Sequence, residues 1–169
     1  MRSFAFASVR NLYVLVSPQK TMPLTSTILY QGHLRTLATH LQSGSMTETD
    51  APTDNAGRGE RFSPTDLVAT ALASCMVTVM GIVAERHGWN ITGLQCEVEK
   101  IMAANPRRIG EVRVALHFPI GRSYDERTRH TLEHAARTCP VIESLHPDCI
   151  KTLTFHWSPS DDAKADRAF

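Results

Sequence analysis

The chain has 169 residues, which suits one domain and is too short for two full ones. Apolar residues make up 42% of the sequence and charged residues 21%, an ordinary globular composition that argues against a disordered or fibrous chain. Lys and Arg number 18 and Asp and Glu 17, so the net charge of +1 gives no basic excess of the kind that binds nucleic acid. The apolar runs are broken before membrane-spanning length, so we expect no membrane segment.

The cysteine pattern argues against a disulfide framework. The four cysteines, Cys75, Cys96, Cys139 and Cys149, are widely spaced, and no CxxC motif occurs. Reduced thiols are the default for such a chain, so we expect a cytoplasmic protein. The sequence also carries no dinucleotide-binding or Walker motif, and we expect no cofactor and no bound metal.

The first 21 residues differ from the rest, because they are basic, contain no acid and hold two apolar clusters. Three interpretations are open: a poor secretory signal, an organelle transit peptide, or translation that begins at Met22. We favour the third, because the patterned sequence starts just afterwards. We therefore expect residues 1–21 to be an unstructured or non-native extension, 22–157 a single domain, and 158–169 a flexible tail.

The next segment has the texture of an antiparallel meander. A short apolar stretch at Ser26–Tyr30 is followed by strand-like segments at Leu34–Leu41 and Ser45–Thr49, and Gln-Gly and Ser-Gly turn signals separate the three. The segment Asp50–Arg61 is rich in Pro, Gly, Asp and Asn, which predicts a loop.

The strongest helix signal follows this loop. Ser63 is a good N-cap, Pro64 suits the first helical position, and Asp66 completes a capping-box pattern. Gly88 is a natural C-terminal glycine. The helix is apolar on nearly every face, so other elements or another subunit must cover it. A thin polar stripe consists of Thr70, Ser74 and Thr78.

Two strands are predicted beyond the helix, at Leu94–Met102 and Glu111–Phe118, paired across a turn at Asn105-Pro106. The second strand alternates apolar and polar side chains, as expected when one sheet face is buried. Together with the meander and the helices, these strands predict an α+β fold.

The last third of the chain predicts a second helix, Ser123–Thr138, with Ser123 and Glu126 as its capping box. Cys139-Pro140 breaks this helix, and Pro140 opens a short helix over Pro140–Leu145. A last strand is predicted at Ile150–Trp157.

The four thiols have different expected roles. Cys75 lies in the middle of the buried helix, where a core cysteine is the ordinary interpretation. Cys139 is the expected N-cap of the short helix, where unpaired backbone N–H groups lower a thiol pKa and favour the thiolate; alternatively, it is a small boundary residue. Cys96 shares a strand face with apolar residues and is expected to be structural. Cys149 has no evident partner.

A metal site is a lesser alternative. His134, Cys139, His146 and Cys149 lie close together in sequence and mix soft and imidazole ligands. Their spacing does not match the paired knuckles of structural zinc sites, so nothing forces them to converge. A serine or cysteine hydrolase is also disfavoured, because no G-x-S-x-G motif occurs.

The residues around Cys75 and Cys139 resemble the OsmC/Ohr family of osmotically inducible and organic hydroperoxide resistance proteins. The resemblance covers about Thr25 to Trp157. It comprises a Ser-Pro-x-acid-Leu helix start, a cysteine well inside that helix, and a Cys-Pro downstream. The segments that carry it are TDAPTDNAGRGERFSPTDLVATALASC, MGIVAERHGW, ANPRRIGEVRVALHF and RTCPVIESLHP.

The resemblance implies an OsmC-like fold, an intertwined homodimer and a thiol peroxidase. Cys75 would be peroxidatic and Cys139 resolving, with an organic hydroperoxide as substrate and a dithiol as reductant. A thiolate attacks the O–O bond and becomes a sulfenic acid, which a second thiol converts to a disulfide. The family supplies a cation beside the thiol from its N-terminal strands, and Arg35 is the best match.

One departure concerns the acid that would hold Arg35. The organic-hydroperoxide branch has a glutamate where this chain has Thr65, with Asp66 one position later, so either Asp66 or Glu60 could be the substitute. Asp66 precedes Cys75 by nine residues, about 13 Å along the helix axis. Any polar group from the helix start must therefore reach Cys75 from a partner subunit. The alternative function is a non-enzymatic homodimer that binds a small apolar ligand at its interface.

Overall fold

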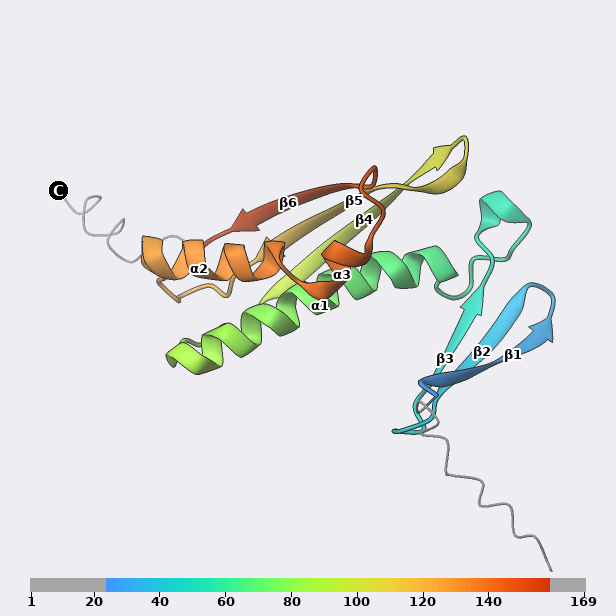
Figure 1. Cartoon of the computed structure of the whole chain (residues 1–169), viewed down its shortest axis with the longest axis horizontal. Coiled ribbons are helices and arrows are strands. Elements are labelled where there is room, and N and C mark those ends of the chain that lie inside the picture. Colours follow the sequence, from blue (N-terminus) through green and yellow to red (C-terminus); the bar gives the residue numbers. More distant parts are fainter. Residues whose placement is uncertain (1–23, 159–169) are drawn as a thin grey trace, which may run out of the picture.

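The computed structural model describes residues 24–158 (Figure 1). The extension expected at 1–21 and nearly all of the tail expected at 158–169 lie outside the described residues. In chain order the elements are β1 (Ser26–Gly32), β2 (Arg35–His40), β3 (Met46–Asp50), a 3-10 turn η1 (Thr53–Asn55), α1 (Pro64–His87), β4 (Gln95–Ala104), β5 (Arg107–His117), α2 (Glu126–Arg137), α3 (Pro140–Ser144) and β6 (Ile150–His156). The α+β class is confirmed.

The first three strands form the predicted antiparallel meander, with the order β1-β2-β3. This small sheet stands apart from the rest of the chain, beyond the start of α1 (Figure 1). It has no core of its own: Ile28, Leu29 and Tyr30 are all more than 60% exposed. Such a sheet needs a further surface to cover it.

Helix α1 begins and ends where the sequence predicts. The Ser63 side chain accepts a hydrogen bond from the backbone N–H of Asp66, and the Asp66 carboxylate accepts one from the backbone N–H of Ser63. This reciprocal capping box satisfies two of the unpaired donors at the helix start. At the other end, Gly88 has a φ of +70°, which a glycine adopts without strain.

The second sheet has the order β4-β5-β6 and covers one side of α1 (Figure 1). Strands β4 and β5 form a long antiparallel hairpin, whereas β6 runs parallel to β5. Strand β5 begins at Arg107, earlier than the predicted Glu111. The turn at Asn105-Pro106 is tight, so Ala104 pairs directly with Arg107 and the ladder continues to the hairpin tip.

The predicted start of the second helix is wrong. Helix α2 begins at Glu126, and its N-cap is Asp125, whose carboxylate accepts the backbone N–H of Thr128. Tyr124 explains the delay, because its buried ring packs against Phe118 and its hydroxyl donates to the carbonyl of Asn90. Residues ahead of Asp125 are therefore held outside the helix.

The core of the chain lies between one stripe of α1, the inner face of the second sheet, and α2. The α1 stripe consists of Ala69, Leu72, Ala73, Met76, Met80 and Ala84. The other side of α1 is open within one chain, where Val68 and Ile82 are 39% and 44% exposed. By length and composition alone α1 could cross a membrane, but its buried stripe packs as a core helix does. The sequence-based expectation that a further subunit covers α1 remains consistent with this open side.

The capping box gives a first prediction. Asp66→Asn should lower the free energy of unfolding by about 0.5–2 kcal/mol, because it removes the charged half of the cap. Burial raises the pKa of Asp66, but hydrogen bonds from Lys100 and Ser63 outweigh it and the net pKa is lowered. The stabilisation is therefore complete above the ordinary carboxyl pKa near 4 and is lost as pH falls through the lowered value.

Urea unfolding at pH 7 and at pH 3 measures this difference. Asp54→Asn is the matched control, because Asp54 forms only an exposed pair with Arg107. Equal unfolding curves for Asp66→Asn and the wild-type chain at pH 7 would contradict the prediction.

Candidate functional site

The structure brings two of the predicted site cysteines together. Cys75 lies in the middle of α1 and is half-buried, whereas Cys139 is fully buried at the start of α3. Helix α3 packs against α1, and the two thiols lie close enough to interact. Residues far apart in the sequence are therefore neighbours where α3 packs against α1.

Cys139 is the N-cap of α3, as predicted, but its predicted pKa shift is wrong. Burial raises the pKa of the Cys139 thiol, and the neighbouring Cys75 raises it further. The backbone N–H groups of Ile142 and Val141 act in the opposite direction, but burial outweighs them. Loss of solvation exceeds the effect of two amide dipoles, so Cys139 is held as the neutral thiol.

The surroundings of the thiol pair are apolar. Cys139 belongs to the buried core, and Cys75 packs against that core from α1. Leu132 and Ala136 of α2 and Met76 of α1 are core members with no exposed surface. A thiolate at Cys75 therefore needs a cation that this core does not supply.

Arg35 has carboxylate partners, but they are in its own sheet and loop. At the start of β2 it is paired in register with Asp50 of β3, and its guanidinium donates to Glu60. Between the two acids that the sequence left open, the structure places Glu60 beside Arg35. Among residues 24–158 of one chain, Arg35 is not in contact with Cys75, because its sheet lies beyond the start of α1 (Figure 1).

Asp50 is a site residue that the sequence interpretation missed. It is fully buried, and its Oδ2 atom accepts the backbone N–H of Glu60 at 3.1 Å and lies 3.6 Å from the Arg35 guanidinium. The backbone N–H of Glu60 lowers the pKa of Asp50, burial opposes it, and Arg35 lowers it further. The predicted loop over Asp50–Arg61 began one residue too early, because Asp50 ends β3 and pairs there with Arg35 of β2.

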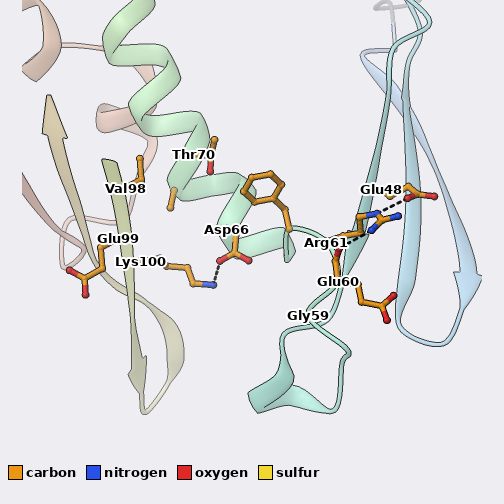
Figure 2. A pocket seen from close by; sticks show the side chains of 11 residues that line it. Glu48, Gly59, Glu60, Arg61, Asp66, Thr70, Val98, Glu99 and Lys100 are labelled. Carbon is orange, nitrogen blue, oxygen red and sulfur yellow. Dashed lines mark hydrogen bonds and ion pairs between the residues drawn. The ribbon is translucent and has the colours of Figure 1, made fainter. Parts of the chain in front are cut away.

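Asp66 is held by a lysine of its own chain (Figure 2). The Nζ atom of Lys100 donates to Asp66 Oδ1 at 2.6 Å, to Thr65 Oγ1 at 2.8 Å and to Ser63 Oγ at 3.3 Å. The Lys100 side chain is only 15% exposed. Asp66 therefore caps α1 and links the helix start to β4. Its carboxylate is already paired with Lys100 of the same chain.

The sequence carried a signal for Lys100. Cys96, Val98 and Lys100 occupy alternate positions along β4, so the three side chains point to the sheet face that covers α1. Glu97 and Glu99 lie between them and point outward. A lysine on the inward face of a strand needs a carboxylate partner, because an unpaired buried charge is costly.

A hollow of about 710 Å³ lies at the start of α1, between the loop that precedes it and β4 (Figure 2). Its lining combines three apolar side chains, Phe62, Ala69 and Val98, with charged groups. The charged residues are Glu48, Glu60, Arg61, Asp66, Glu99 and Lys100. Neither Cys75 nor Cys139 lines it.

The remaining thiols and histidines form no second centre within residues 24–158. Burial raises the pKa of Cys96, and the Cys149 thiol is buried and contacts the carbonyl of Ile150 at 3.8 Å. No three His, Cys, Asp or Glu side chains of this part of the chain are placed to hold a metal ion. His146 is 65% exposed while Cys139 is fully buried, so the alternative zinc cluster is not assembled.

The Arg35 cluster gives a second prediction. Asp50→Asn should destabilise the chain more than Glu60→Gln, because Asp50 is buried and ionised whereas Glu60 is half-exposed. The pKa of Asp50 is lowered in the folded chain, so its contribution is present above the unfolded carboxyl pKa and is lost as pH falls.

The urea midpoints of both variants at pH 7 give the order, and the midpoints at pH 3 should lie closer together. A Glu60→Gln midpoint below that of Asp50→Asn at pH 7 would show that the buried carboxylate is not the dominant partner.

Comparison with known proteins identifies the family. The OsmC-like protein family matches residues 57–153. A crystal structure from Psychrobacter arcticus, described as an osmotic stress induced and detoxification response protein, is 49% identical, covers 80% of this chain and 97% of its own, and superposes with a TM-score of 0.76. No protein of curated function matches the chain.

Two more distant crystal structures share the fold. An organic hydroperoxide resistance protein from Legionella pneumophila is 18% identical, with a TM-score of 0.60 over 79% of this chain and 98% of its own. The organic hydroperoxide resistance protein OhrB of Bacillus subtilis is also 18% identical, with a TM-score of 0.56 over 78% and 98%. The chain belongs to the OsmC-like protein family.

Proposed function

We propose that the chain is a thiol-dependent peroxidase that reduces organic hydroperoxides, with Cys75 as the peroxidatic and Cys139 as the resolving cysteine. The observation that carries this proposal is the pairing of the two thiols in an apolar core. A structural role would require only burial of each thiol, whereas a disulfide-forming cycle requires that they be neighbours.

The oxidative half of the proposed cycle needs only these two thiols and the peroxide. The Cys75 thiolate attacks one oxygen of the peroxide, the O–O bond breaks, and the alcohol leaves after protonation. Cys75 is then a sulfenic acid. The Cys139 thiol attacks its sulfur, water leaves, and a disulfide joins the two residues. A dithiol reductant from outside the chain restores both thiols.

The two roles follow from burial. Cys75 retains some exposed surface, so a peroxide can reach it, while Cys139 has none. The raised pKa of Cys139 keeps it a neutral thiol until the sulfenic acid forms beside it. An apolar setting favours an organic hydroperoxide over hydrogen peroxide, because it can bury the alkyl group.

A homodimer is part of the proposal. The small N-terminal sheet and the open side of α1 leave large apolar side chains exposed in a single chain. They include Ile28, Leu29, Tyr30, Met46, Val68 and Ile82. A second copy would cover these surfaces and could bring its Arg35 to Cys75, supplying the cation that the thiolate needs. The proposed setting is the cytoplasm, where thiols stay reduced.

The alternative function, a non-enzymatic homodimer that binds a small apolar ligand, has one observation in its favour. The hollow at the start of α1 contains Phe62 and Val98 but no cysteine. A hydroperoxide assay separates the two functions, because a binding protein would lose thiols only at the rate of ordinary thiols.

Cysteine variants test the catalytic roles. Cys75→Ser should abolish consumption of cumene hydroperoxide, because no other thiol is both accessible and paired. Cys139→Ser should react once and stop at a sulfenic acid. Cys96→Ser, which changes another half-buried thiol, is the matched control and should turn over normally. Turnover of Cys139→Ser at the wild-type rate would exclude the resolving role, because direct reduction of the sulfenic acid by the dithiol should be slower than attack by a neighbouring thiol.

Arginine variants test the source of the cation. Arg35→Ala should raise the pKa of Cys75 and slow its reaction with the hydroperoxide without breaking the dimer. Arg113→Ala is the matched control, because Arg113 also pairs with two carboxylates, Glu111 and Glu99, but on the outer face of the second sheet. The pH dependence of Cys75 alkylation measures the pKa. An unchanged pKa in Arg35→Ala would remove Arg35 from the site.

The oligomeric state is tested by sedimentation. The wild-type chain should be a dimer at low micromolar concentration, since burying apolar surface contributes about 25 cal/mol per Å². Ile82→Glu should shift the equilibrium toward monomer, because it places a charge on the open side of α1. A cooperatively folded wild-type monomer at low micromolar concentration would contradict the dimer.

A further inference from the structure

We propose that the reductant opens the disulfide from one side: its thiolate attacks the sulfur of Cys75, and Cys139 leaves as the first free thiol. The mixed disulfide with the reductant therefore forms on Cys75 and not on Cys139. This inference rests on the proposed function, because it concerns the disulfide that the cycle would form.

The burial of Cys139 carries the inference. Its exposed fraction is 0% within a single chain, where it belongs to the same buried core as Leu132 and Ala136, both also 0% exposed. This cover comes from the subunit itself. A partner subunit could add to this cover and could not remove it, so Cys139 is buried in a monomer and in a dimer alike.

Cys75 lies at the border between the buried and the open side of α1. Its neighbour Met76 is fully buried, whereas Ala71 and Ser74 are exposed, as is Thr78 one turn further on. Residues three and four positions apart share a helix face, so Ala71 and Thr78 flank Cys75 on its solvent side. Within one chain this stripe gives a small thiolate access to Cys75, and the inference requires that the proposed dimer leave it open at Ala71 and Thr78.

The geometry of thiol–disulfide exchange reinforces this direction. The attacking, central and leaving sulfurs approach a straight line as one S–S bond forms and the other breaks. Attack on Cys75 from the exposed stripe pushes the electron pair toward the buried Cys139. Attack on Cys139 would need a nucleophile inside the packed core, where interiors leave little space larger than a water molecule.

One effect opposes the inference and is weaker. A leaving thiol with a raised pKa leaves more slowly, and burial raises the pKa of Cys139. The backbone N–H groups of Ile142 and Val141 offset part of this cost. Slower departure reduces the rate of reduction, but it cannot redirect attack to a sulfur that the reductant does not reach.

The exchange steps balance as follows. A reductant thiolate attacks Cys75, forms a new S–S bond with it and breaks the bond to Cys139, which leaves as a thiolate and takes a proton from water. The second thiol of a dithiol then attacks the reductant sulfur and releases Cys75, with the electrons of the reductant transferred to the two cysteines. A monothiol stops at the mixed disulfide, which can be trapped.

Peptide mass spectrometry after trapping tests the inference. Cys96→Ser protein, which lacks the other half-buried thiol, is oxidised with diamide, treated briefly with glutathione, quenched in acid and alkylated with N-ethylmaleimide. The expected product carries glutathione on Cys75 and maleimide on Cys139, in at least tenfold excess over the reverse product. Equal amounts, or glutathione mainly on Cys139, would overturn the inference.

Two single-thiol variants provide an independent rate measurement. In a background that carries both Cys96→Ser and Cys149→Ser, Cys139→Ser and Cys75→Ser each leave one thiol. Each variant is treated with 5,5′-dithiobis(2-nitrobenzoate), and release of the thionitrobenzoate by glutathione is timed. Cys75 should load and release at least tenfold faster than Cys139, and failure of Cys139 alone to load also supports the inference. Equal rates with an unchanged circular dichroism spectrum would overturn it.

The two proposals fail in distinguishable ways. Diamide forms the disulfide without a peroxide, so a disulfide that forms with diamide and not with cumene hydroperoxide refutes the peroxidase alone. A disulfide that forms with neither oxidant refutes both.

Discussion

The packing of one stripe of α1 against the second sheet and α2 is the interaction on which the rest of the structure depends. This stripe, which runs from Ala69 to Ala84, fixes the helix with Met76 inward and the adjacent Cys75 at the edge of the buried surface. The same core holds α3 against α1 and seats Cys139 beside Cys75. The thiol pair is therefore a product of core packing, and it requires no flexible loop.

The polar groups around the start of α1 are divided into two separate ion-pair clusters. Lys100 binds Asp66 and fixes the helix start to β4, whereas Arg35 binds Asp50 and Glu60 within the N-terminal sheet and its loop. Because Asp66 is paired with Lys100, the carboxylates beside Arg35 are those of Asp50 and Glu60.

The single chain leaves two surfaces that require cover, the N-terminal sheet and the open side of α1. Neither surface has a partner among residues 24–158, and both carry large apolar side chains. In the proposed dimer these surfaces would be buried, and the Arg35 cluster of one subunit would complete the thiol site of the other. Stability and activity would then depend on the same interface.

Local signals predicted most of the fold. The capping box at Ser63, the terminal Gly88 and the strand alternation each act within a few residues, so the sequence located them closely. The start of α2 was misplaced because Tyr124, through its contact with Asn90, holds the preceding residues outside the helix. That contact joins segments that are distant in sequence, whereas the signals that mark a helix start depend only on neighbouring residues.

The candidate site was also predictable only in part, because some of its properties depend on contacts between distant segments. Cys75 and Cys139 were identified through their sequence surroundings, but the raised pKa of Cys139 depends on how deeply tertiary packing buries it. Asp50 and Lys100 were missed, although side-chain parity along β4 contained a signal for Lys100. Asp50 and Lys100 lie on strands that are distant in sequence from the groups they pair with. The sequence predicted those strands but not which residues lie opposite one another.

The oxidation product of the wild-type chain tests most directly whether Cys75 and Cys139 act as a catalytic pair. One equivalent of cumene hydroperoxide, added to the reduced protein, should lower the intact mass of each chain by two hydrogen atoms, and the digest should contain a peptide that links Cys75 to Cys139. A chain that keeps its mass, or that gains oxygen at Cys75 without this linked peptide, would contradict the proposal that the neighbouring thiols form a catalytic pair.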